Sequence, residues 1–275
     1  MFTNTACRPL FVGLILVLST APQRSLAQEF RVYTSVVDRT AGGNDKPRTS
    51  LTVFHAGKVY DYIESAEETV IFQSAQNRFV VLSKRHDLAT EIRQDEVRRF
   101  LDLARSHARE LISEWQRDGA ERREAIAALE FQLLPEFEVH DDTEAKLLTL
   151  TSPQLCYQVK YADAPSPEIV QTYLKAADWT AQLNAVLHPH ALLPDARMRL
   201  NEELRTRGVL PVEVDLRIEG SHPIHLTASH VWSWKLLPFD RKFIDDREQQ
   251  LRQVDGRLMP FRDFQRETLI SQRKR

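Results

Sequence analysis

The sequence predicts an α+β fold, in which a curved antiparallel sheet resembles an incomplete barrel and helices inserted between groups of strands pack on one face. Apolar residues first recur at every second position, as they do in half-buried strands. Only short turn-forming segments separate these strands, which leaves no room for the crossover helices that parallel strands need. The apolar period then changes to three and four residues, and strands return afterwards, which is typical of the α+β class.

The first group of strands is predicted from alternation and turn composition. Phe30, Val32, Thr34 and Val36 fall on one face of the opening strand, and residues 41–47 form a loop. Two hairpins and a short strand follow, separated by turns at 56–58 and 74–77. These strands span residues 50–55, 59–64, 69–73, 78–83 and 88–92.

A long helix is predicted over residues 95–115, where apolar residues form one stripe. Residues 121–129 fit either a second helix or a connection. Ser166, Pro167 and Glu168 start a further helix, because they supply a capping hydroxyl, a proline at the first helical position and an acid in the first turn. The later helices end near Leu187, at Gly208 and near Val254.

The remaining strands form a second group. Asp141 and Asp142 have the composition of a turn between two of them, and residues 220–223 separate the last pair. The predicted strands span residues 137–140, 145–151, 155–161, 210–219 and 224–236.

Residues 1–27 are predicted to be a signal peptide, cleaved between Ala27 and Gln28. Arg8 makes the start of the chain basic, residues 10–20 are apolar, and small side chains precede the cleavage site. The apolar run is shorter than the roughly 20 residues that span a bilayer. We therefore expect an exported protein, periplasmic or secreted, with no transmembrane segment in the mature chain. Residues 28–255 form one domain and residues 256–275 a charged C-terminal tail.

Composition excludes some functional classes. The chain has 37 basic and 39 acidic residues, so it lacks the clustered basic excess of a nucleic-acid-binding protein. Cys156 is the thiol that remains after cleavage, because Cys7 lies in the signal peptide. The mature chain therefore has no internal disulfide, and the strand-like surroundings of Cys156 favour a packed thiol.

Motif inspection finds no catalytic or cofactor signature. The spacings of nucleophile elbows, zinc proteases and phosphate-binding loops are all missing. His222, His225 and His230 suggest a metal site, but positions 225 and 230 point to opposite faces of a regular strand. Residues 140–142 and 188–190 also contain histidines, in contexts typical of a turn and of a helix end. We therefore assign no catalytic residue, metal site or cofactor.

Aromatic residues are the candidate ligand-binding side chains. Tyr60 and Tyr62 share one face of a strand, with Phe54 expected across the hairpin from them, and Trp232 and Trp234 share a face of the last strand. These five residues could line an apolar cavity or groove, or they could pack beneath the helices. The second interpretation is favoured, because an antiparallel sheet must cover one face with apolar groups.

Residues 51–61 (LTVFHAGKVYD) and 77–82 (NRFVVL) resemble the sheet meander of periplasmic lipoprotein carriers of the LolA/LolB type. The order of the predicted elements is similar to that family over most of the mature chain. The resemblance implies a curved, incomplete barrel that is covered by helices and holds acyl chains on its inner surface. It transfers no individual binding residue to this sequence.

The leading functional hypothesis is an exported, non-enzymatic protein that binds a lipid or another apolar small molecule in the concave face of its sheet. One alternative is a structural or interaction protein of the cell envelope, which has a protein partner and no ligand cavity. The other is a hydrolase without a recognisable motif.

Overall fold

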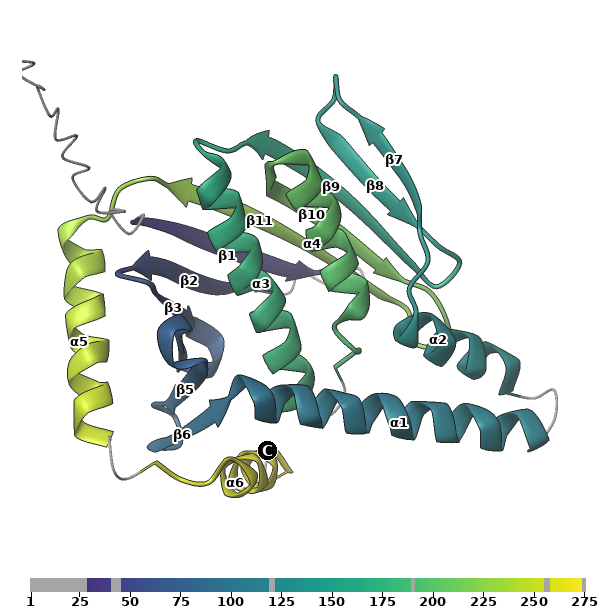
Figure 1. Ribbon diagram of the computed structural model, residues 1–275, viewed down its shortest axis with the longest axis horizontal. Coiled ribbons are helices and arrows are strands. Elements are labelled where there is room, and N and C mark those ends of the chain that lie inside the picture. The colour runs from purple at the N-terminus through teal and green to yellow at the C-terminus, as the bar shows by residue number, and fades with distance from the viewer. Residues whose placement is uncertain (1–28, 41–45, 119–121, 189–190, 255–257, 274–275) are drawn as a thin grey trace, which may run out of the picture.

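The structure is a computed structural model that describes residues 29–40, 46–118, 122–188, 191–254 and 258–273 (Figure 1). Within these ranges, eleven strands form one antiparallel sheet that does not close into a barrel, so the predicted α+β fold class is confirmed. The signal peptide and most of the predicted 41–47 loop lie outside the described residues. The strands are β1 (Phe30–Asp38), β2 (Arg48–His55), β3 (Lys58–Ile63), β4 (Glu68–Gln73), β5 (Arg78–Ser83), β6 (Leu88–Arg93), β7 (Glu138–Asp142), β8 (Leu147–Thr151), β9 (Leu155–Asp163), β10 (Val209–Ile218) and β11 (Ile224–Ser233).

The sheet consists of two meanders that join at its centre. Its strand order is β6-β5-β4-β3-β2-β1-β11-β10-β9-β8-β7, so the first strand pairs with the last. In that pairing Val32 lies opposite Trp232, and Thr34 lies opposite His230. The two ends of the domain are therefore joined by hydrogen bonds that no local sequence pattern specifies.

Helices connect the two strand groups and cover the sheet. Two short 3-10 helices, Glu64–Ala66 and Ser74–Gln76, form turns within the first meander. The α-helices are α1 (Gln94–Asp118), α2 (Arg123–Leu133), α3 (Pro167–Leu187), α4 (Asp195–Arg207), α5 (Pro238–Val254) and α6 (Phe261–Arg273). The ambiguous 121–129 segment is thus part of a helix, whereas the predicted turn at Asp141 and Asp142 is wrong because both residues end β7.

The α3 face of the sheet is the face that packs against α3 and α4, which lie in front of the strands in Figure 1. Alternate residues of the central strands point toward these helices, as the period of two requires. Phe30, Val32 and Phe54 join the core with Leu174 from α3 and Leu200 from α4. Burial of this apolar surface is the main force that holds the two helices on the sheet.

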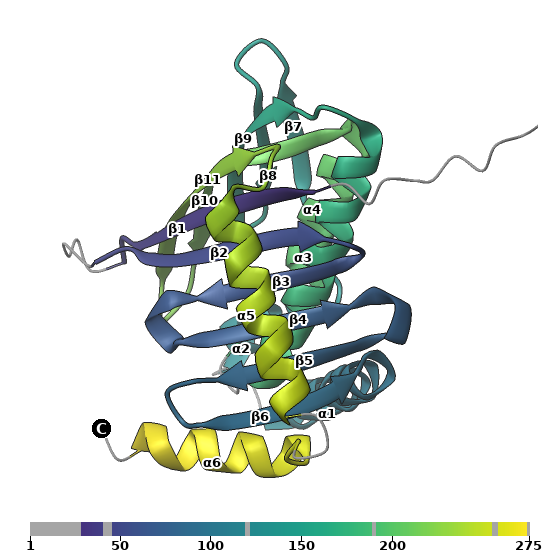
Figure 2. The ribbon, with the colours of Figure 1, turned by 90° about the vertical axis from the view of Figure 1, so that its left-hand side faces the viewer.

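The α5 face is the opposite side of the sheet. Figure 2 shows α5 running across β2 to β5, with α3 and α4 behind the sheet. Ile244 and Leu251 of α5 pack in one buried cluster with Val53, Ile71 and Val80. Helices therefore cover both faces of this half of the sheet, and not one face as predicted, because α5 returns over the first meander.

Residues in the predicted C-terminal tail form α6, which lies beside β6 at the sheet edge (Figure 2). Phe261 packs in a cluster with Ile92 and Val97, and Phe264 is 2% exposed. Thr90 Oγ1 also donates a hydrogen bond to the Met259 carbonyl. The tail prediction is wrong for these residues, because a helix with apolar anchors protects an edge strand that would otherwise be free to pair.

Among the helices in the described ranges, none has both the length and the apolar character needed to cross a membrane.

Candidate functional site

A cavity of about 230 Å³ lies between the α3 face of the sheet and helices α3 and α4. A volume of this size is equivalent to about eight water molecules. Side chains from three strands and two helices line it. They are Val32, Thr34, Ser50, Thr52, Phe54, Asp61, Tyr173, Ala176, Ala177, Thr180, Ala181, Asn184 and Arg197. We refer to this space as the sheet–helix cavity.

The cavity exists because short side chains face each other across the gap between the sheet and α3. Ala176, Ala177 and Ala181 lie on the helix side, and Thr34 and Thr52 lie on the sheet side. Such side chains are too short to fill the space that close packing would otherwise occupy. Thr180 and Asn184 are exposed, so the cavity reaches solvent beside the C-terminal half of α3.

Asp61 contributes a carboxylate from the floor of the cavity. The register places Val32, Thr52 and Asp61 side by side on neighbouring strands. Thr52 Oγ1 donates a hydrogen bond to Asp61 Oδ1 at 2.7 Å. Asp61 is only partly accessible, because it faces the cavity and not the outer surface. Burial raises the pKa of Asp61, although the hydrogen bond from Thr52 opposes that rise.

Glu68 adds a second carboxylate on the same face, one strand further along the sheet. It pairs with Ile63, which is two residues from Asp61, so the two acids are diagonal neighbours. Burial, followed by the negative charge of Asp61, raises the pKa of Glu68 to about 7. Within the described residues, neither Asp61 nor Glu68 forms an ion pair within 4 Å.

The Glu68→Gln variant is expected to become more stable than the wild type as the pH rises. The native Glu68 carboxyl keeps its proton up to about pH 7, whereas the unfolded chain releases it near pH 4.5, so wild-type stability falls across this window. We expect a relative gain of about 2 kcal/mol, less than the full shift implies, because the side chain is partly exposed.

Urea unfolding at several pH values measures this gain. Glu67→Gln, at the exposed neighbouring position, is the matched control and should show no such trend. If the unfolding free energies of Glu68→Gln and the wild type changed with pH in the same way, the prediction would be contradicted.

Arg197 contributes a guanidinium from the helix side. Its Nε donates to Asn201 Oδ1 at 3.1 Å, and Asn201 Nδ2 donates to Asp178 Oδ1 at 2.8 Å. Arg205 completes the chain through a 2.6 Å contact with the other oxygen of Asp178. Asn201 is fully buried, so this network holds Arg197 in place at the cavity wall.

His230 lies beside the cavity, opposite Thr34 in the register. Its Nδ1 is 2.9 Å from Thr34 Oγ1, and its buried Nε2 has no hydrogen-bond partner in the described part of the chain. Burial first, and the Arg197 charge second, lower the pKa of His230 to about 4. The imidazole is therefore neutral at ordinary pH.

Phe54 and the two tryptophans form an aromatic cluster on the α3 face. Phe54 stacks on Phe30 at 4.1 Å between ring centroids, and Trp232 meets Tyr173 edge-on at 4.7 Å. Trp234 stacks on Trp232 and is 42% exposed. Phe54 also lines the sheet–helix cavity, where it contributes apolar surface together with Val32.

Tyr60 and Tyr62 point to the α5 face, so the predicted arrangement with Phe54 across the hairpin is wrong. Phe54 pairs with Val59, and Tyr60 pairs with Val53. Tyr60 is 1% exposed, and its hydroxyl donates to Glu248 Oε1 of α5 at 2.7 Å. Side chains alternate between faces, so the two tyrosines belong to the α5 packing and not to a surface shared with Phe54.

The other histidines and the thiol lie elsewhere. His225 Nε2 is 2.7 Å from Asp215 Oδ2, on the face opposite His230, as the odd spacing predicts. His140 and His222 are exposed, and His190 lies outside the described residues. Cys156 is partly buried on β9. Over the described ranges, no three histidine, cysteine or acidic side chains cluster as metal ligands.

Sequence reasoning missed Asp61 and Arg197, although each carries a detectable signal. Asp61 shares its strand face with Val59 and Ile63, so a carboxylate sits in an otherwise apolar row. Arg197 lies on the helical face of Leu200 and Leu204, both fully buried. A charged residue at an apolar position of an amphipathic element indicates a buried charge that needs a partner or a ligand.

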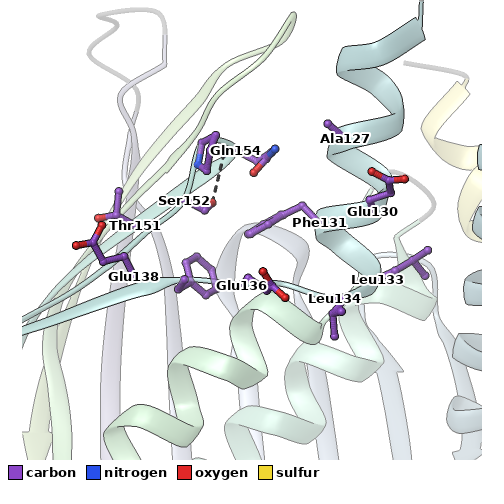
Figure 3. A pocket seen from close by; sticks show the side chains of 12 residues that line it. Ala127, Glu130, Phe131, Leu133, Leu134, Glu136, Glu138, Thr151, Ser152 and Gln154 are labelled. Atoms are coloured by element: carbon purple, nitrogen blue, oxygen red, sulfur yellow. Dashed lines mark hydrogen bonds between the residues drawn. The ribbon is translucent and has the colours of Figure 1, made fainter.

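A second, larger hollow of about 1,020 Å³ lies between α2 and the β7–β9 strands. Figure 3 shows Phe131 and Leu134 on its helix side and Thr151, Ser152 and Gln154 on its sheet side. Every residue that lines it is at least partly exposed. It is therefore an open surface depression without the buried polar groups of the sheet–helix cavity.

Comparison with known proteins returns no assignment, since no protein-family model matches the chain and no curated protein is a significant match. The sheet–helix cavity and its side chains are therefore the basis for proposing a function.

Proposed function

We propose that this protein is an exported, non-enzymatic binding protein that holds a small polar molecule in the sheet–helix cavity. The observation that carries the proposal is the set of polar groups at the cavity whose bonding the protein leaves incomplete. These are the Asp61 carboxylate, whose Oδ1 accepts a hydrogen bond from Thr52, and the Arg197 guanidinium, whose Nε donates to Asn201; both side chains line the cavity. Buried polar atoms are normally paired, so unpaired ones beside a cavity favour a bound partner.

The volume and the lining of the cavity favour a small polar ligand over the apolar molecule that the sequence suggested. Pockets for drug-sized ligands usually measure about 300–1,000 Å³ and are mainly apolar. The sheet–helix cavity is smaller, and hydroxyl, amide and charged groups share its wall with Phe54 and Val32. An acyl chain would leave these polar groups without partners, which costs free energy.

A hydrolase is less well supported by the same geometry. Thr34 Oγ1 and His230 Nδ1 are at hydrogen-bond distance, as a nucleophile and its base would be. However, no group among the described residues bonds the second nitrogen of His230, and its lowered pKa makes it a weak base near neutral pH. Binding without chemistry accounts for the arrangement better.

The Ala177→Leu variant is expected to lose ligand binding, because the larger side chain occupies the cavity. The probes are a panel of amino acids, carboxylic acids, amines and sugars, together with a fluorescent fatty acid. At least one small polar compound should raise the Tm of the wild type by several degrees and leave that of Ala177→Leu unchanged.

Gln171→Leu is the matched control, since it adds the same side chain at an exposed position of α3. It should respond to the compound as the wild type does. A panel without any effect on wild type would overturn the proposal, as would an equal response of Ala177→Leu or a preference for the fatty acid.

A further inference from the structure

We propose that the ligand is a small zwitterion, such as an amino acid, whose carboxylate binds Arg197 and whose ammonium group binds Asp61. This inference rests on the proposed function, because it names the ligand class of the same cavity. Asp61 lines the cavity from the sheet and Arg197 lines it from α4, so the two opposite charges lie on opposite walls of the cavity.

The two charges lie close enough to act on the same side chain without pairing with each other. Tyr173 lines the same cavity and is influenced by both: burial raises the pKa of its hydroxyl, the charge of Arg197 opposes that rise, the charge of Asp61 adds to it, and a hydrogen bond with Arg197 opposes it. In the described part of the chain, no ion pair within 4 Å joins Asp61 to Arg197. The space between them is the cavity itself, which an occupant with two charged ends would bridge.

Arg197 keeps its full charge available for a ligand. Its Nε bonds the amide oxygen of Asn201, which is a neutral group. The nearest carboxylate in this network, Asp178, is bonded to Asn201 and to Arg205 instead. The network therefore orients the guanidinium without neutralising it. A planar guanidinium fixed in this way is suited to a carboxylate, which it can bind through two parallel hydrogen bonds.

Asp61, in turn, is suited to a cationic group of the ligand. It accepts a hydrogen bond from the neutral Thr52 hydroxyl, and the acidic Glu68 is its diagonal neighbour. A carboxylate in such a place is stabilised by a cationic group that also donates hydrogen bonds. An ammonium group does both, and the hydroxyls of Ser50 and Thr52 line the same wall and can accept its other hydrogen atoms.

A ligand with a single charge would pair with only one of the two charged side chains. A simple anion held by Arg197 would face the Asp61 carboxylate across the cavity, and a simple amine held by Asp61 would face the guanidinium. Because like charges repel more strongly beside a protein wall than in bulk water, either ligand would bind more weakly than one that carries both charges. A zwitterion satisfies both walls, and a small amino acid suits a cavity of about 230 Å³.

Isothermal titration calorimetry of the wild-type protein tests the inference. The probes are glycine, L-alanine and 4-aminobutyrate, compared with propionate and propylamine, which carry one charge each. At least one zwitterion should bind ten times more tightly than both single-charge compounds. Arg197→Met and the isosteric Asp61→Asn should each weaken that zwitterion at least tenfold, and Arg197→Met should weaken propionate but not propylamine.

Arg199→Met is the matched control, because Arg199 lies on the same helix and pairs with Glu202 and Glu203 away from the cavity lining. It should bind the zwitterion as the wild type does, and melting curves check that each variant is folded. If a neutral or singly charged compound binds as tightly as the zwitterions and remains sensitive to Ala177→Leu, this inference fails while the proposed function stands. If no compound in either panel binds, both fail.

Discussion

The His230→Asn variant is expected to gain about 3 kcal/mol of stability relative to the wild type when the pH falls from about 7.5 to 4. His230 is 9% exposed, and its pKa is lowered from 6.5 to about 4. Asparagine keeps a polar group near Thr34 but does not titrate. Acid should therefore destabilise the wild type through a group that the variant lacks.

The sign follows from the two states of the imidazole. Between about pH 6.5 and 4 the unfolded chain carries a proton on His230, whereas the native protein does not. Because the unfolded state binds more protons, wild-type stability falls as the pH falls through this window. Glu68 acts in the opposite direction between pH 4.5 and about 7, so the wild-type curve alone would hide the effect.

The measurement is the difference in unfolding free energy between variant and wild type, from urea titrations at several pH values. His222→Asn removes an exposed histidine and is the matched control, which should track the wild type. If the difference for His230→Asn stays constant from pH 7.5 to 4, the assignment of a neutral, buried imidazole to native His230 is wrong.

The Arg31→Met variant is expected to lose about 3 kcal/mol of stability, because it leaves a buried carboxylate without its cation. Asp240, at the start of α5, is fully buried, and its Oδ2 lies 3.3 Å from Arg31 Nε. The same oxygen accepts a hydrogen bond from the Leu237 backbone at 2.7 Å. The Arg31 guanidinium also lies over the Phe239 ring, so the variant loses this cation–π contact between β1 and α5 as well.

Chemical denaturation at pH 7.5 measures the loss. Arg241→Met, which removes a 2.7 Å pair with the more exposed Glu29, is the matched control and should cost less than about 1 kcal/mol. Adding Asp240→Asn to Arg31→Met should restore part of the stability, because the unpaired charge is then gone. Equal losses in the two single arginine variants would contradict the prediction.

Local patterns predicted most elements, because alternation and capping depend on neighbouring residues alone. Ser166 and Pro167 marked the start of α3, and Gly208 follows the end of α4 with a positive φ of 68°. The hairpin turn after β2 was also predicted, and Ala56 and Gly57 both adopt the left-handed backbone that such turns need. The C-terminal helix was missed, because residues 261–273 are rich in charged side chains and only a few apolar anchors mark its buried face.

The candidate site could not be assembled in the same way. Periodicity showed that Tyr60 and Tyr62 share a face, but it could not show which helix covers that face. The pairing of β1 with β11 brings His230 beside Thr34, although 196 residues separate them in the chain. The placement of α4 then brings Arg197 to the same space. Each of these contacts depends on distant segments that meet only in the folded protein.

The sequence by itself determined the class of the fold and the strand faces, because the period of two and the period near 3.6 are written in consecutive residues. Only the tertiary structure decided that α5 covers one face, that α3 and α4 cover the other, and that two opposite charges remain apart across a cavity. The physical reason is that burial and charge pairing depend on which residues are neighbours in space. The order of residues along the chain does not specify those neighbours.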